Sequence, residues 1–154
     1  MKIRTGKHPS NSNVQISVEH QILKKLGTEL GCELLPKSLV SLDGRKVEID
    51  GYSDKPKILC EIYAHIGGLK GSQYRKPITD AVKLLLAEKW LGGNWRKLLV
   101  FVDEEARGKF DSGTWYSEAI KNFGIETCVI SLSPAAQLKI SKAQKRQRME
   151  NASD

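Results

Sequence analysis

Two short, largely apolar runs near the middle of the chain contain acidic residues. The first run is Val47–Gly51, which contains Asp50, and the second is Ile58–Tyr63, which contains Glu61. Alternating apolar and polar residues are typical of a strand, and Asp54–Pro56 between the runs is typical of a turn. The pattern therefore predicts a hairpin whose two strands bring Asp50 and Glu61 close together.

The flanking sequence alternates between helical and strand patterns. Apolar residues recur at three- and four-residue spacing over Val18–Leu30, which predicts an amphipathic helix ending near Gly31. The continuous apolar run Leu98–Val102 is typical of a central strand covered on both faces. Alternation of strand and helix after Glu61 predicts an α/β sandwich with a mixed sheet. Further expected elements are strands at 33–35, 39–42 and 126–132, helices from about residue 72 and at 114–123, a turn at 43–44 and an acidic loop at 103–105.

A chain of 154 residues is most simply one domain with a core of its own. Residues 1–12 are polar and predict a flexible N-terminal arm. Residues 13–134 contain the strand and helix patterns and form the expected domain. Residues 135–154 form a basic C-terminal tail with few apolar anchors, expected to be a helix or a disordered arm that can be removed without loss of the fold.

Composition predicts an ordinary globular protein, with 40% hydrophobic and 28% charged residues. No apolar run approaches the ~20 residues of a membrane span, and the N-terminus lacks the apolar stretch of a secretion signal. We therefore expect a cytoplasmic protein with no membrane partner. Cys32, Cys60 and Cys128 are widely spaced and odd in number, which indicates buried reduced thiols and not a zinc site.

The net charge of +7 and the isoelectric point of about 9.3 favour a polyanionic partner. Part of the excess is local, because the tail contains five Lys and Arg residues against two acids. Lys139, Lys142, Lys145 and Arg146 recur at short intervals and are expected to contact phosphates. A mild positive charge that only keeps the protein soluble is the alternative interpretation.

Paired carboxylates followed by lysines suggest a metal site. Asp50 and Glu61 together could hold one hard cation such as magnesium, with the carbonyl of Ile62 as a further oxygen ligand. Such a cation activates water and neutralises charge on a phosphate. Lys70, Gln73 and Lys76 follow the second strand, and the expected chemistry is therefore cleavage of phosphodiester bonds.

The order of these elements resembles that of the PD-(D/E)XK, or restriction-endonuclease-like, nuclease superfamily. The resemblance covers roughly residues 12–132: a helix with Glu19, strands with Asp50 and Glu61, a helix from about Ser72 and a strand at Lys97–Val102. It implies a three-layer α/β/α core with a mixed central sheet and a nuclease dependent on Mg²⁺ or Mn²⁺, acting on DNA more than on RNA. A homodimer is a further arrangement that the resemblance allows.

The chain departs from the motif of this superfamily at one position. Tyr63 stands two residues after Glu61, where the resemblance implies a lysine. Lys70 is the first candidate to replace it from the following segment, and Lys76 is the second. The remaining residues assigned to the site are Glu19 and Gln73 for catalysis, Asp50 and Glu61 for the metal, and Lys70, Tyr74, Arg75 and Lys76 for contacts with nucleic acid.

Other interpretations of the same residues remain open. Asp50 with Gly51 could form a turn, and a salt bridge to Lys70 or Lys83 could satisfy Glu61 in place of a metal. A catalytically inactive module that keeps the fold and binds nucleic acid is the alternative function. A subunit whose basic tail binds an acidic protein is a third.

Overall fold

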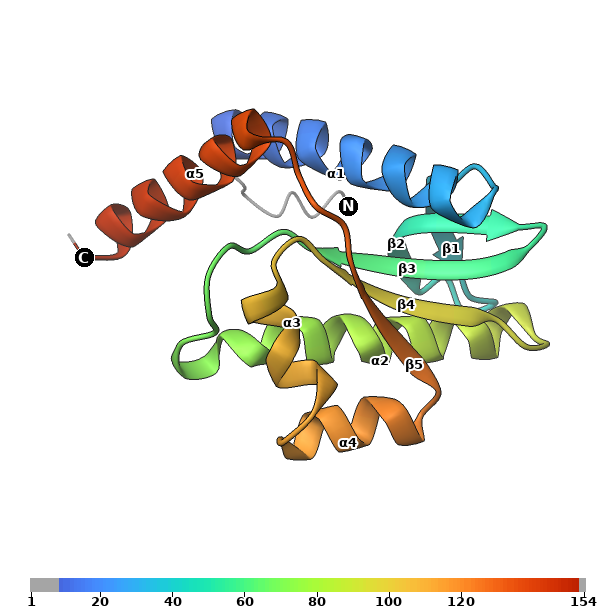
Figure 1. The fold of residues 1–154 in the computed structure, drawn as a ribbon. Helices are drawn as coiled ribbons and strands as arrows, with labels where there is room; N and C mark the ends of the chain where they lie inside the picture. The colour runs from blue at the N-terminus through green and yellow to red at the C-terminus, as the bar shows by residue number, and fades with distance from the viewer. Residues whose placement is uncertain (1–8, 153–154) are drawn as a thin grey trace.

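The computed structural model describes the backbone of residues 9–152 and the side chains of residues 17–152 (Figure 1). Five strands and five α-helices follow one another along this part of the chain. In order they are α1 (Pro9–Leu30), β1 (Leu35–Val40), β2 (Lys46–Asp54), β3 (Lys57–Tyr63), the 3₁₀ turn η1 (Gly71–Tyr74), α2 (Arg75–Leu91), β4 (Arg96–Phe101), α3 (Glu104–Asp111), α4 (Trp115–Asn122), β5 (Ile125–Val129) and α5 (Pro134–Ala152).

The strands form one mixed sheet in the order β1-β2-β3-β4-β5. The first three strands are antiparallel, and a two-residue turn joins β2 to β3, as the sequence predicted. The strands β3, β4 and β5 run parallel, connected through the helices. The prediction of an α/β protein with a mixed sheet is confirmed.

Helices cover both faces of the sheet, and each face has its own core (Figure 1). On one face α1 and α5 pack on alternate residues of the central strands, such as Cys60 and Val100. On the other face α2, α3 and α4 pack on the intervening residues, such as Leu59 and Phe101. Because side chains alternate along a strand, Glu61 faces the side of α2.

Several boundaries differ from the expectation. The helix α1 begins at Pro9, inside the segment expected to be an arm, while residues 1–8 lie outside the described residues. The two strands expected on either side of Pro36 are one strand, β1, which tolerates a proline because it lies at the sheet edge. The acidic loop is the start of α3, where Asp103 accepts a hydrogen bond from the backbone N of Glu105 and caps the helix.

The tail also differs from the expectation of a weakly packed segment. It forms α5, and Ala136 and Ile140 are buried in the core beneath it. Removal of everything after Pro134 would expose this core, so the structure leads us to expect that truncation lowers stability. The apolar content of the segment is low, but its two anchors fall at i and i+4, on one side of the helix.

A bulge interrupts β2 beside β1. Leu35 pairs with Tyr52 and Lys37 with Ile49, so Asp50 and Gly51 together lie opposite the single residue Pro36. An extra residue of this kind bends a strand and redirects its side chains. Asp50 and Gly51 are thus part of a strand, and the interpretation of the pair as a turn is wrong.

Gly51 is required by close packing at this bulge. A Cβ at this position would clash with Cys60 Sγ and would lie 2.6 Å from Leu23 Cδ2. Glycine therefore lets α1 and β3 approach the bulged strand, and Asp50 is held beside them.

We expect Gly51→Ala to lower the free energy of unfolding by about 1–3 kcal/mol, the usual effect of overpacking a core. Gly108→Ala is the matched control, because a Cβ there meets nothing within 4 Å and lies within α3. That substitution should raise stability by up to about 1 kcal/mol through helix propensity. Urea unfolding of both variants measures the difference, and equal stabilities would contradict the packing argument.

Candidate metal site

Asp50 lies where β2 separates from β3. The ladder between these strands joins Gly51–Asp54 to Lys57–Cys60 and goes no further. Beyond it, the backbone N of Ile62 donates a hydrogen bond to Asp50 Oδ2 at 2.9 Å. The carboxylate thus takes the place of a neighbouring strand. Since the N–H and C=O of one strand residue point to the same side, the carbonyl of Ile62 also faces this gap.

Glu61 is a buried carboxylate, with 1% of its surface exposed. Burial is the largest cause that raises its pKa, and the charge of Asp50 and a hydrogen bond with Asp50 add to it. The charge of Lys83 acts in the opposite direction, and the resulting pKa is about 9. The hairpin therefore brings the two predicted acids together, and at neutral pH Glu61 holds a proton unless a cation replaces it.

The helix α2 supplies charged side chains above the acid pair, as we call Asp50 and Glu61. Lys83 Nζ lies 3.0 Å from Glu61 Oε1, with 30% of the lysine side chain exposed. Lys76 Nζ lies 2.6 Å from Asp80 Oδ1. Burial lowers the pKa of Lys76, but its hydrogen bond to Asp80 and the charges of Asp80, Glu61 and Asp50 raise it above the ordinary value.

These lysines do not fully satisfy the acids. Lys83 is within ion-pair distance of Glu61 Oε1, yet among the described residues no hydrogen bond of acceptable geometry reaches that oxygen. The Oδ2 atom of Asp80, whose residue is 1% exposed, also lacks a partner there. Three carboxyl groups face two lysines, so the lysines can balance the cluster only while Glu61 keeps its proton.

A hard cation fits this donor set. Within residues 17–152 no group of three or more His, Cys, Asp or Glu side chains is arranged to hold a metal ion. The acid pair alone supplies two carboxylates, and the carbonyl of Ile62 adds an oxygen at the same gap. Magnesium is commonly held by one or two carboxylates and keeps several waters, so this set suits it.

Of the other predicted residues, Lys76 lies near enough to the acid pair for the charges of Glu61 and Asp50 to act on it, whereas Lys70 and Gln73 belong to an exposed segment. Lys70 is exposed, and its backbone N donates to Gln73 Oε1 at 2.8 Å, so Gln73 caps the turn η1. Glu19 belongs to α1, on the opposite face of the sheet from α2. The charges of Asp50, Lys83 and Asp80 act on Glu61, and the charge of Glu61 acts on Lys76.

The residues predicted to contact nucleic acid differ in how much of each side chain is exposed. Tyr74 stacks on Tyr116 with ring centroids 4.9 Å apart, so one face of its ring is covered. Arg75 is exposed at the start of α2. The described basic residues of the tail, Lys139, Lys142, Lys145 and Arg146, are all exposed on α5.

Lys83 was expected only as a salt-bridge partner of Glu61, and Asp80 was not among the predicted site residues. Their spacing contains the signal, because Lys76, Asp80 and Lys83 follow at four and three residues and share one face of a helix. That face could not be known to meet Glu61 until the position of α2 on the sheet was known.

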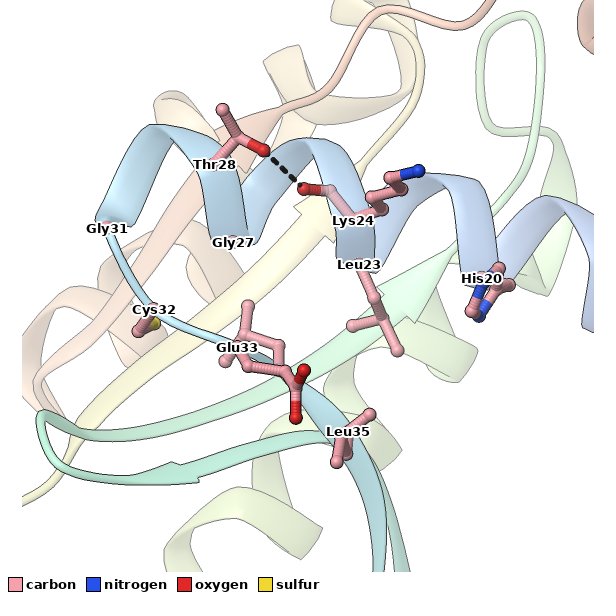
Figure 2. Close-up of a pocket in the computed structure, with 10 residues that line it drawn as sticks. His20, Leu23, Lys24, Gly27, Thr28, Gly31, Cys32, Glu33 and Leu35 are labelled. Atoms are coloured by element: carbon pink, nitrogen blue, oxygen red, sulfur yellow. Dashed lines mark hydrogen bonds between the residues drawn. The ribbon is translucent and has the colours of Figure 1, made fainter.

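A hollow in the surface lies away from the acid pair. It has a volume of about 630 Å³ and runs along the second half of α1 and the segment that leads into β1 (Figure 2). His20, Lys24, Cys32 and Glu33 line it. Since α1 covers the face opposite α2, this hollow is separate from the acid pair.

Comparisons with known proteins identify no relative. No family model, no curated protein and no solved structure matches the chain. None of the helices in the described part of the chain is both long and apolar enough to cross a membrane.

The raised pKa of Glu61 predicts how stability depends on pH. Between its ordinary pKa of 4.5 and about 9, the folded protein holds a proton that the unfolded chain releases. This contribution is complete below the ordinary pKa and is lost as the pH rises toward the folded value. Without metal, we expect the melting temperature to fall by at least about 2–4 °C from about pH 5 to about pH 9.

Glu61→Gln should flatten this dependence, because the amide resembles the protonated acid. Glu118→Gln, an exposed glutamate of α4, is the control and should melt as wild type does at each pH. Thermal melts across the pH range measure all three proteins. A wild-type curve as flat as that of Glu61→Gln would contradict the assignment.

Proposed function

We propose that the protein is a metal-dependent nuclease that hydrolyses phosphodiester bonds, in DNA more than in RNA. The observation that supports this best is the acid pair at the open end of the hairpin, where a buried carboxylate oxygen lacks a hydrogen-bond partner. The net charge of +7 favours a polyanionic substrate. The order of elements agrees with the restriction-endonuclease-like resemblance, which the proposal extends to this chain.

Asp50 and Glu61 would hold Mg²⁺ or Mn²⁺, with the carbonyl of Ile62 beside them. The cation would lower the pKa of a bound water and neutralise charge that develops on the phosphate. Asp50 also fixes the strand edge, because its Oδ2 accepts the hydrogen bond from the Ile62 backbone. Glu61 would exchange its proton for the metal, and metal affinity would then rise with pH.

Lys83 is the lysine that the geometry favours for the role missing at Tyr63. It comes from α2 and lies 3.0 Å from Glu61, whereas Lys70 lies exposed in a loop. An ammonium group beside the acid pair can stabilise a phosphate or orient the attacking water. Lys76 is held by Asp80 and would serve as a second contact with phosphate.

A metal titration tests the proposal. Manganese at about ten times its dissociation constant should stabilise wild type by about 1.4 kcal/mol. At one fixed manganese concentration the stabilisation should be larger at pH 8 than at pH 6, because the affinity rises with pH. Asp50→Asn and Glu61→Gln should stay folded and lose this response, as well as metal-dependent cleavage of single-stranded, duplex and branched DNA. A melt insensitive to metal, together with no cleavage of any substrate, would defeat the nuclease proposal.

The roles of the lysines give a separate test. Lys83→Ala should lower kcat by about 100-fold or more with little change in KM, as expected for loss of a contact made in the transition state. Lys89→Ala, an exposed lysine of the same helix, is the control and should keep wild-type turnover. Adding Tyr63→Lys to Lys83→Ala should recover part of the loss. Lys70→Ala with the larger defect would overturn the assignment of Lys83.

A catalytically inactive module that binds nucleic acid is the second candidate. The ion pair between Lys83 and Glu61 favours it, because a lysine can occupy the place of the metal. Under this alternative the protein binds DNA with a strong salt dependence but does not respond to manganese, and Glu61→Gln destabilises it by stranding Lys83.

A further inference from the structure

The C-terminal helix α5 forms two hydrogen bonds with the loop that follows β3. The backbone N of Ile66 donates to Gln144 Oε1 at 2.9 Å, and Gln144 Nε2 donates to the backbone O of Ile66 at 3.1 Å. One side-chain amide thus satisfies both the donor and the acceptor of a single residue, as a neighbouring strand would. Gln144 therefore fixes both the position and the orientation of this backbone.

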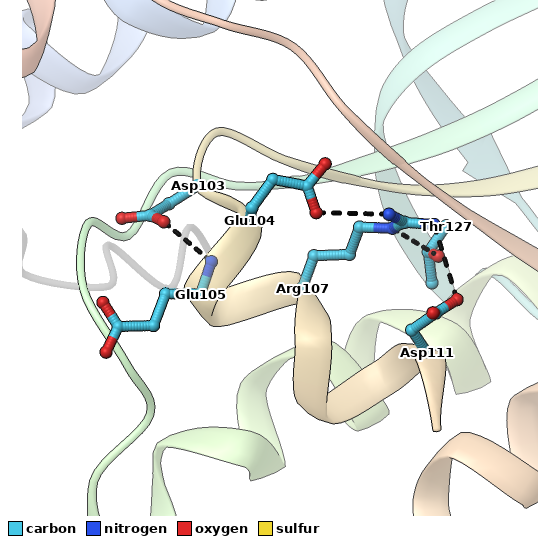
Figure 3. Close-up of polar contacts among 6 residues, drawn as sticks. All are labelled: Asp103, Glu104, Glu105, Arg107, Asp111 and Thr127. Atoms are coloured by element: carbon cyan, nitrogen blue, oxygen red, sulfur yellow. Dashed lines mark hydrogen bonds and ion pairs between the residues drawn. The ribbon is translucent and has the colours of Figure 1, made fainter. Parts of the chain in front are cut away.

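The same loop, Ala64–Lys70, is held from the side of α3. The backbone N of Gly67 donates to Asp103 Oδ2 at 2.6 Å, while Asp103 Oδ1 caps α3 at Glu105 N (Figure 3). Gly67 has a φ of 91°, and a Cβ on Gly68 would lie 2.9 Å from Glu105 Oε1. The loop is thus fastened between α3 and α5.

The two hydrogen bonds between Gln144 and Ile66, which we call the amide clasp, connect the loop to the core. Ile140 and Ala136, one and two turns before Gln144, are buried against α1. The position of Gln144 is therefore set by core packing. At its N-terminal end, the loop continues directly from β3, and Ile66 follows Ile62 by four residues. A shift of the loop would therefore move the end of β3, where the backbone N of Ile62 donates to Asp50.

Three basic residues of the tail lie on another flank of α5 than Gln144. Lys139, Lys142 and Arg146 are spaced by three and four residues and share a flank, whereas Gln144 shares its flank with Arg148. His65 belongs to the same loop. Burial is the largest cause that lowers its pKa, and the charge of Arg148 also lowers it. The amide clasp therefore connects α5 to the loop from a different flank of the helix than Lys139, Lys142 and Arg146.

We propose that Gln144 is a positioning residue for the acid pair, acting through its two hydrogen bonds to Ile66 on the loop that continues from β3. The catalytic consequence rests on the proposed nuclease function, while the structural consequence does not. If the clasp holds the site, loosening it disturbs Ile62 and its hydrogen bond to Asp50 as well as Ile66.

Amide hydrogen exchange measures this without any assay of activity. In Gln144→Ala we expect exchange to rise by about tenfold or more at Ile66, and by a smaller factor of at least about threefold at Ile62. Gln144→Glu keeps the acceptor for Ile66 N and loses the donor to Ile66 O, so an intermediate increase is expected. Gln147→Ala, an exposed glutamine on the same helix, is the control and should exchange as wild type does.

Kinetics then test the catalytic consequence. Gln144→Ala should lower kcat by about tenfold, with KM changed less than about twofold, because displaced catalytic groups slow the chemical step. Faster exchange confined to Ile66, or wild-type kcat in Gln144→Ala, would overturn the positioning role. A wild type that cleaves no substrate would overturn the nuclease proposal alone, and exchange at Ile62 would still decide whether the clasp holds the acid pair.

Discussion

The burial of Glu61 against Asp50 is the constraint on which the proposed site depends. A carboxylate with 1% exposure beside a second carboxylate is unfavourable unless a proton, a lysine or a metal compensates it. Lys83 supplies part of the compensation, and the raised pKa shows that a deficit remains. A protein retains such a deficit at the cost of stability, which is characteristic of sites that bind a cation or exchange a proton.

The bulge in β2 makes this arrangement possible. If β2 and β3 stayed paired beyond Gly51, the Ile62 backbone would bond to a strand, and Asp50 would have no place at its edge. The extra residue opposite Pro36 bends β2 away, and Asp50 completes the hydrogen bonding of Ile62 with its side chain. Close packing of Gly51 against Leu23 then ties the bulge to α1 on the other face of the sheet.

Local patterns predicted the hairpin that carries Asp50 and Glu61 and most of the other elements, but not α3. The alternation around Asp50 and Glu61 and the turn between them specify a hairpin, and the apolar runs specify the central strand and the main helices. The pattern gave no means of placing α2 over β3, so Lys70 was preferred to Lys83. The pattern also did not predict that the tail packs on the domain, because the few apolar residues of α5 are buried only where α1 supplies a surface for them.

The core beside Glu61 gives a physical reason for a tyrosine at position 63. Tyr63 lies on the same face as Glu61 and packs edge-on against Phe101, with ring centroids 6.0 Å apart. A lysine in its place would lose this aromatic contact and the stacking of Tyr63 on His65. Lys83 instead reaches Glu61 from α2 with its side chain partly in solvent, so a cation meets the acid without losing all its hydration. The strand can then keep an aromatic core position while the helix supplies the charge, provided that α2 is held in register on the sheet.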